Sequence, residues 1–241
     1  MNSMLLKLCN FFVIVFVSLT SIYSQETNKE FKIKPSKQKE IFDILQKNAL
    51  IKYNQYNGIL SKRKVTNRHY DPTSGELTEV EEALVERIEY FYKKPKVKAI
   101  TYKKNGIEVD PNSFKPPLTD PPLPLFGPDN EKNYDLNITG ETKINGLLCY
   151  VIDIQPKFKT DRHLKGKLFI DQKNYKAVKL KASFAKLPFG AKSLDIDVDF
   201  LTIDGFSIAN KGIIRYTAKV PLIIHERVEN EFESIEDSLV K

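Results

Sequence analysis

The chain has 241 residues, of which 38 are Lys or Arg and 31 are Asp or Glu, so its formal net charge is +7. A basic chain raises nucleic acid as a partner, but no aromatic-basic motif of a known nucleic-acid fold is present and an apolar N-terminus points to export. We therefore exclude nucleic acid binding. No later apolar run approaches the ~20 residues of a membrane-spanning helix.

Residues 1–24 have the pattern of a cleavable secretory signal peptide. Lys7 provides a positive charge, residues 8–20 are almost all apolar, and small and polar residues follow up to Ser24. The alternative is a membrane anchor, which an apolar run of about 13 residues is too short to form. Cys9 lies inside the run, which argues against a lipid-modified cysteine at the mature terminus. We predict cleavage after Ser24 and a periplasmic protein, with peripheral contact to anionic lipid headgroups as an option for its excess lysines.

The remainder reads as one domain. We predict a flexible segment over residues 25–35, a single domain over 36–234 and a flexible acidic tail over 235–241. Cys149 is the only cysteine left after cleavage, so no intramolecular disulfide can form, and we interpret it as a small buried hydrophobe.

One amphipathic helix is predicted at the start of this domain. It runs from Ser36, as its N-cap, to about Tyr53, because Ile41, Ile44 and Leu45 lie on one stripe at helical spacing. A helix with one apolar stripe must pack on something, and the simplest partner is a sheet formed by the following residues.

Residues 78–92 are compatible with two structures. Thr78 and Glu81 resemble a capping box, which favours a helix. Ile88, Tyr90 and Tyr92 alternate with Glu89 and Phe91, which favours a strand. We predict the strand, over residues 85–93.

Six of the thirteen prolines lie in residues 114–129. Proline fixes φ and removes a donor, so this stretch is neither regular helix nor central strand. Its apolar side chains distinguish it from a solvated linker. Two interpretations stay open: a loop that packs over one end of the core, or a lid over an apolar cavity with Leu123, Leu125 and Phe126 as the lid residues.

Apolar and polar residues alternate along several short stretches, as in antiparallel strands with one buried face. Turn signals such as Asn105-Gly106, Asn145-Gly146 and Asp204-Gly205 connect these stretches. Strands are predicted at residues 58–70, 85–93, 96–102, 107–110, 134–140, 148–155, 166–171, 176–184, 194–203, 206–218 and 220–234.

The sequence lacks a catalytic or metal-binding signature. His69, His163 and His225 lie on separate segments without ligand spacing, and no nucleophile motif occurs. We predict neither catalytic residues, nor a metal site, nor a cofactor.

Three aspartates on one strand face invite a calcium interpretation. Asp195, Asp197 and Asp199 alternate along residues 194–203. Alternate strand residues lie about 6.6–7 Å apart, which is too far for one tight cation site. We predict cross-strand ion pairs with Lys179 and Lys181 instead.

The order of elements and three local sequences resemble a known family. The chain reads YFYKKPKVK at 90–98, GLLCYVIDIQPK at 146–157 and GKLFIDQKNYKAVKLK at 166–181. This pattern resembles the LolA-like superfamily of lipoprotein carriers of diderm bacteria. The resemblance implies an α+β fold, in which a strongly curved, open antiparallel β half-barrel has its concave face covered by helix. It also implies an apolar cavity for acyl chains and no catalytic residues. The proline-rich stretch has no match in the family pattern.

We accordingly expect a periplasmic, non-enzymatic binder of a lipid or an acylated lipoprotein. The expected cavity walls are Tyr150, Ile152, Ile154, Val178, Leu180, Phe184, Val198 and Phe200. One alternative is an envelope scaffold or lipid-responsive sensor that contacts another envelope protein. A further alternative is a hydrolase, which requires His163 or His225 to meet a carboxylate.

Overall fold

A computed structural model describes residues 31–90, 95–116, 122–187, 189–220 and 224–241. The chain divides into two units, Met1–Lys32 and Ile33–Lys241, and every helix and strand described below belongs to the second. The predicted signal peptide and most of the predicted flexible segment lie outside the described residues.

The described residues contain one long helix, α2, at Pro35–Gln55. It begins one residue before the predicted Ser36, because Pro35 occupies the first turn, where its fixed φ suits a helix and its missing N–H costs nothing. Lys34 is therefore the N-cap, and it makes no side-chain capping bond in the described part of the chain. Ile41 and Leu45 are buried, as the apolar stripe predicts.

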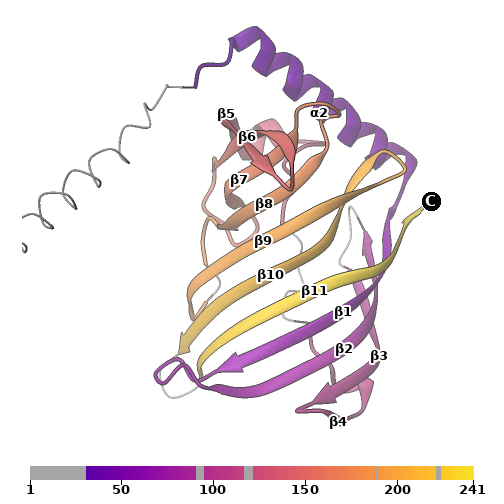
Figure 1. The fold of residues 1–241 in the computed structure, drawn as a ribbon, viewed down its shortest axis with the longest axis vertical. Helices are drawn as coiled ribbons and strands as arrows, with labels where there is room; N and C mark the ends of the chain where they lie inside the picture. Colours follow the sequence, from indigo (N-terminus) through magenta and orange to yellow (C-terminus); the bar gives the residue numbers. More distant parts are fainter. Residues whose placement is uncertain (1–30, 91–94, 117–121, 188, 221–223) are drawn as a thin grey trace, which may run out of the picture. The chain divides into compact units, whose positions relative to one another are not determined.

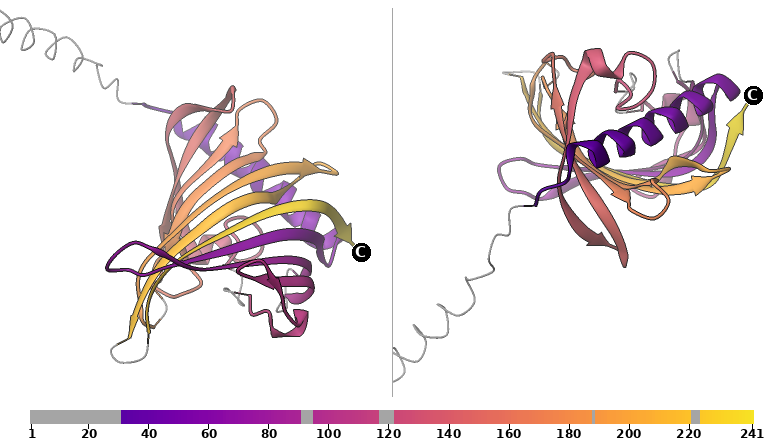
Figure 2. Two further views of the ribbon diagram at one scale, coloured as in Figure 1. Left: turned by 60° about the horizontal axis from the view of Figure 1, so that its bottom comes forward. Right: turned by 90° about the horizontal axis from the view of Figure 1, so that it is seen from above.

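Within the described residues, eleven strands form one antiparallel sheet that does not close (Figure 1). The order across the sheet is β4-β3-β2-β1-β11-β10-β9-β8-β7-β6-β5. The strands are β1 Gly58–Tyr70, β2 Leu77–Tyr90, β3 Lys96–Lys104, β4 Ile107–Glu108, β5 Tyr134–Ile144, β6 Leu147–Pro156, β7 Leu164–Asp171, β8 Ala177–Phe184, β9 Ala191–Ile203, β10 Phe206–Val220 and β11 Ile224–Val240. A 3-10 turn, η1 Pro111–Ser113, and a short helix, α3 Asn130–Asn133, flank the proline-rich stretch. Figure 2 shows that the sheet is curved and that α2 lies on its concave side.

The alternation and turn signals predicted most of these strands correctly. β2 confirms the predicted strand over residues 85–90 but begins earlier, at Leu77, whereas residues 91–94 are outside the described part. The side chains that resemble a capping box have other roles there: Thr78 donates to the His69 carbonyl, and Glu81 accepts from Asn67. Asn105 and Gly106 both adopt positive φ between β3 and β4, as a tight hairpin requires.

The C-terminus differs from the prediction. Residues 235–240 are not a flexible tail but the last part of β11, which pairs with the start of β1 from Gly58↔Val240 to Lys62↔Glu236. The prediction was wrong because it took the acidic side chains as a sign of disorder. Charged side chains that alternate with apolar residues such as Leu239 are equally compatible with a strand that has one solvent-exposed face.

Candidate functional site

Two cavities lie on one face of the sheet, which we call the inner face. The first cavity has a volume of about 290 Å³ and the second about 300 Å³. Each is at the lower end of the range of roughly 300–1,000 Å³ that is typical of ligand pockets. Both are lined mainly by apolar side chains.

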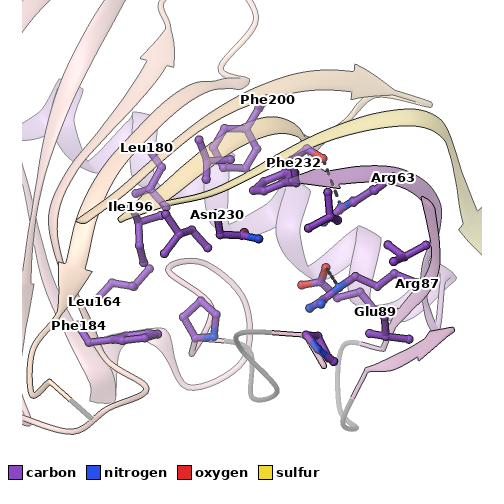
Figure 3. Close-up of a pocket in the computed structure, with 18 of the residues that line it drawn as sticks. Arg63, Arg87, Glu89, Leu164, Leu180, Phe184, Ile196, Phe200, Asn230 and Phe232 are labelled. Atoms are coloured by element: carbon purple, nitrogen blue, oxygen red, sulfur yellow. Dashed lines mark hydrogen bonds and ion pairs between the residues drawn. The ribbon is translucent and has the colours of Figure 1, made fainter. Parts of the chain in front are cut away.

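Strands from both halves of the sheet line the first cavity (Figure 3). In Figure 3 the apolar Leu164, Leu180 and Phe184 lie on one side, while Arg63, Arg87 and Glu89 lie on the other. The remaining walls are Val65, Val85, Val97, Phe114, Pro116, Pro122, Ile196, Val198, Phe200, Ala209, Ile214, Asn230 and Phe232. The cavity therefore has a long apolar part and one polar end.

Helix α2 and the proline-rich stretch contribute to the second cavity. Its walls include Leu45, Ala49 and Tyr53 of α2, together with Leu168 and Ile170 of β7. Four residues, Pro122, Leu164, Leu180 and Phe200, line both cavities, so the two adjoin.

The predicted lid residues Leu123, Leu125 and Phe126 all line the second cavity. Several bonds attach this part of the chain to the body of the sheet. The Leu123 N–H donates to the Arg162 carbonyl at 2.8 Å, and the Leu123 carbonyl accepts from the Tyr134 hydroxyl at 3.2 Å. The Phe126 ring lies 6.4 Å from that of Phe42 on α2.

Four of the eight predicted wall residues line a cavity, namely Leu180, Phe184, Val198 and Phe200. Ile152 and Ile154 are completely buried and belong to the packed core. Tyr150 is half-buried, and burial raises the pKa of its hydroxyl. Neither Tyr150 nor the two isoleucines are among the residues that line the two cavities.

Val178 lies on the opposite face of the sheet, where it packs against the buried cluster of Cys149, Val151 and Phe169. The reason is a β-bulge: Phe169 pairs with Lys179 and Ile170 pairs with Ala177, so Val178 is an extra residue. Assigning Val178 to the cavity wall was therefore wrong, because the prediction assumed unbroken alternation. Cys149 is fully buried, as predicted.

The prediction missed the cavity walls on β1, β2 and β11. Val65, Val85 and Phe232 line the first cavity from strands whose inner faces also carry Arg63 and Asn230. Because polar and apolar residues mix on this face, alternation alone did not reveal it. The odd-numbered residues of β1 share one face of the strand, and this spacing is the sequence signal that could have identified the inner face.

A hydrogen-bonded polar network lies next to the first cavity. Asn230 Nδ2 donates to Asn67 Oδ1 at 2.5 Å, and Asn67 Nδ2 donates to Glu81 Oε2 at 2.9 Å. Glu81 also accepts from Tyr102 at 2.5 Å and lies 2.8 Å from the Lys104 ammonium. Burial acts to raise the pKa of Glu81, but the hydrogen bonds from Lys104, Tyr102 and Asn67 together lower it to about 2.

One group of side chains has the composition of a metal site. Ligand atoms of His69, Glu79 and Glu81 lie within 4.8 Å of one another. However, the Lys104 ammonium lies 3.5 Å from Glu79 and 2.8 Å from Glu81. The Lys104 ammonium thus already neutralises these carboxylates, and this geometry fits an ion-pair network better than a metal site.

The predicted ion pairs of the aspartate row are confirmed for Asp197 and Asp199. Lys179 Nζ lies 2.5 Å from Asp197 and 2.9 Å from Asp199, and Lys181 lies 3.9 Å from Asp197. Asp195 is opposite Arg215 in the register of β9 and β10.

The hydrolase alternative required His163 or His225 near a carboxylate. His163 Nδ1 is 2.6 Å from Thr160 Oγ1, and its ring lies against Tyr134 and Phe158. Burial lowers the pKa of His163, which favours its neutral form. The histidine that lies within 4 Å of carboxylates in the described ranges is His69 instead, near Glu81 and Glu226, whereas His225 interacts with the Asp71 carboxylate only at longer range.

Several solved structures are similar to this chain at low sequence identity. Similar structures include a putative outer membrane lipoprotein-sorting protein domain from Vibrio parahaemolyticus (11% identity, 86% of this chain and 93% of that chain, TM-score 0.44). They also include LolA superfamily protein NE2245 from Nitrosomonas europaea (11%, 83% and 94%, TM-score 0.40) and the MucA/MucB complex of Pseudomonas aeruginosa (12%, 84% and 99%, TM-score 0.27). No protein-family model matches the chain, and no curated protein matches it.

None of the helices in the described residues is long and apolar enough to cross a membrane.

Proposed function

We propose that the protein is a periplasmic, non-enzymatic binder or carrier of a lipid or of the acyl chains of a lipoprotein. The observation that carries this proposal is the pair of adjoining apolar cavities, with Leu180 and Phe200 as walls of both. Burial of an acyl chain contributes ~0.8 kcal/mol per CH₂, so such a chain can bind usefully through its length alone. The signal-peptide pattern of residues 1–24 supports export.

In this proposal α2 and residues 122–129 are the cover of the binding site. Gln46 of α2 supports this role: its amide nitrogen donates to the Gly127 carbonyl at 2.8 Å, and its amide oxygen accepts from the Gly127 N–H at 2.9 Å. These few polar contacts join the two parts of the cover, α2 and residues 122–129, to each other. Such contacts can open more readily than a packed core, which suits ligand entry.

The test uses an uncharged acyl ligand, methyl laurate, on protein that has been stripped of lipid. We expect binding by displacement of a fluorescent acyl probe, and native mass spectrometry should detect the bound ester. Leu180→Trp should weaken binding roughly tenfold, because a larger side chain at the shared wall excludes about two methylene groups. Lys181→Trp is the matched control, since Lys181 is the next residue of β8 and is exposed. If wild-type protein binds no acyl ligand, charged or uncharged, the proposal is wrong.

A further inference from the structure

The polar end of the first cavity contains a buried cation with almost no partners. Arg63 is 8% exposed, although guanidinium groups are rarely buried without a carboxylate. One of its five N–H donors reaches the Ala209 carbonyl at 3.4 Å, a long contact. The buried Nε nitrogen has no hydrogen-bond partner among the described residues. The guanidinium also lies 5.1 Å from the centre of the Phe232 ring.

The other polar side chains of this cavity are better satisfied. Arg87 is paired with Glu89 at 3.4 Å, and Asn230 donates to Asn67. Of the residues that line the first cavity, Arg63 is the one with a buried, unpartnered side-chain nitrogen in the part of the chain that the structure describes. A buried donor that is left unpaired costs free energy. An unpaired donor in a cavity wall therefore indicates a ligand that accepts hydrogen bonds.

Nearby carboxylates do not neutralise this cation by contact. Glu89 and Asp237 attract Arg63 at longer range, but neither forms an ion pair with it within 4 Å in the described ranges. Glu89 is shared with Arg87, and it also attracts Lys52 of α2. Among the described residues that line this cavity, two cations, Arg63 and Arg87, therefore accompany one carboxylate, Glu89, which favours a negatively charged ligand group.

We propose that the first cavity binds an amphiphile with one acyl chain and an anionic headgroup, with Arg63 as the headgroup contact. The planar guanidinium fork matches a carboxylate or a phosphate with two parallel hydrogen bonds. The apolar walls, among them Leu180, Val198 and Phe200, receive the chain. This inference rests on the proposed function and narrows it, because an uncharged acyl group would leave Arg63 unpaired.

The experiment compares three ligands with the same chain on wild-type protein at pH 8: laurate, methyl laurate and lauroyl lysophosphatidate. Displacement of an uncharged fluorescent acyl probe gives each affinity. We expect one or both anionic ligands to bind roughly tenfold to a hundredfold more tightly than the ester, the range of a charge-assisted hydrogen bond. The laurate and lysophosphatidate arms decide whether a carboxylate or a phosphate is the better headgroup.

Arg63→Met tests the residue itself, with Arg68→Met as the matched control. Arg68 is on the same strand but is bonded to Glu231 at 2.9 Å and lies 3.6 Å from Glu229. Arg63→Met should lose the preference for the anion and still bind methyl laurate, whereas Arg68→Met should keep both. Circular dichroism checks that each variant folds. Should Arg63→Met fail to fold, Arg63→Lys takes its place, and it should reduce the preference several-fold because the fork is lost.

The outcomes separate two failures. If methyl laurate binds to wild type as tightly as both anionic ligands, or if Arg63→Met keeps the preference, the headgroup inference is overturned and the proposed function stands. If none of the three ligands binds, the proposed function itself fails.

Discussion

Two charged residues of neighbouring strands, the half-buried Glu81 and the buried Arg63, have opposite surroundings. Glu81 of β2 accepts hydrogen bonds from Asn67 and Tyr102 and pairs with Lys104. Arg63 of β1 has one long contact to a carbonyl. A buried charge is stable only when its desolvation is offset by partners, so Glu81 has a structural role and Arg63 is open to a ligand.

Glu81→Gln should lower the free energy of unfolding at pH 7 by about 1–3 kcal/mol, because the partners lose an ionised acceptor. The folded-state pKa of about 2 lies below the ordinary 4.5. The ionised carboxylate therefore stabilises the wild type fully above pH 4.5, and this stabilisation is lost as the pH falls towards 2. Urea unfolding at pH 7 and pH 3 measures both effects. Glu82→Gln, at the exposed neighbouring position, is the control. An unchanged acid dependence in Glu81→Gln would contradict the network.

At the scale of elements, β-bulges decide which side chains face the cavities. The β7–β8 pairing skips Val178, and the β9–β10 pairing skips a residue between Ala209 and Lys211. A further irregularity in β5 lies beside Ile138, whose N–H donates to the Gln38 side chain of α2 at 3.2 Å. Each bulge increases local twist and bends the strand, so it helps to curve the sheet and changes the face of a residue.

The contact between α2 and the proline-rich stretch depends on a glycine. Gly127 has φ +122, and a Cβ there would lie 2.5 Å from the Tyr53 ring. Gly127→Ala should therefore lower the free energy of unfolding by roughly 1–3 kcal/mol more than Gly75→Ala. Gly75 also has positive φ, but a Cβ there would meet nothing within 4 Å, so the difference isolates the clash. Denaturant unfolding of both variants gives this difference, and equal losses would show that Tyr53 moves aside freely.

At the scale of the molecule, the first and last strands hold the sheet together. β1 pairs with β2 on one side and with β11 on the other, so β11 joins the N-terminal strands to the rest of the sheet. This pairing connects residues at opposite ends of the sequence, and the first cavity takes walls from both sides of it. An intact β1–β11 pair is thus a condition for the cavity.

Removal of residues 235–241 should destabilise the protein, because Gly58 to Lys62 of β1 would lose their β11 partners. We expect a loss of several kcal/mol, since each lost backbone hydrogen bond contributes roughly 0.5–1.5 kcal/mol. Thermal unfolding followed by circular dichroism is the measurement, with removal of Lys241 alone as the control. If both truncated forms melt at the wild-type temperature, the end of β11 has no such role.

The sequence by itself determined the strands, most of the turns and the main helix of this protein. These features depend on local causes: period-2 alternation, positive-φ turn residues such as Asn105 and Gly106, and an apolar stripe at helical spacing. It also indicated four of the residues that line the first cavity, because Leu180, Phe184, Val198 and Phe200 continue a regular alternation.

Only the tertiary structure decided which residues meet at the cavities. Val178 changes face because of a pairing irregularity, and residues 235–240 form a strand because β1 is there to accept them. Arg63 is distinguished by the partners that it lacks, which depends on residues more than a hundred positions away, such as Ala209 and Phe232. Local sequence cannot contain this information, because pairing register and burial are set by contacts between distant segments.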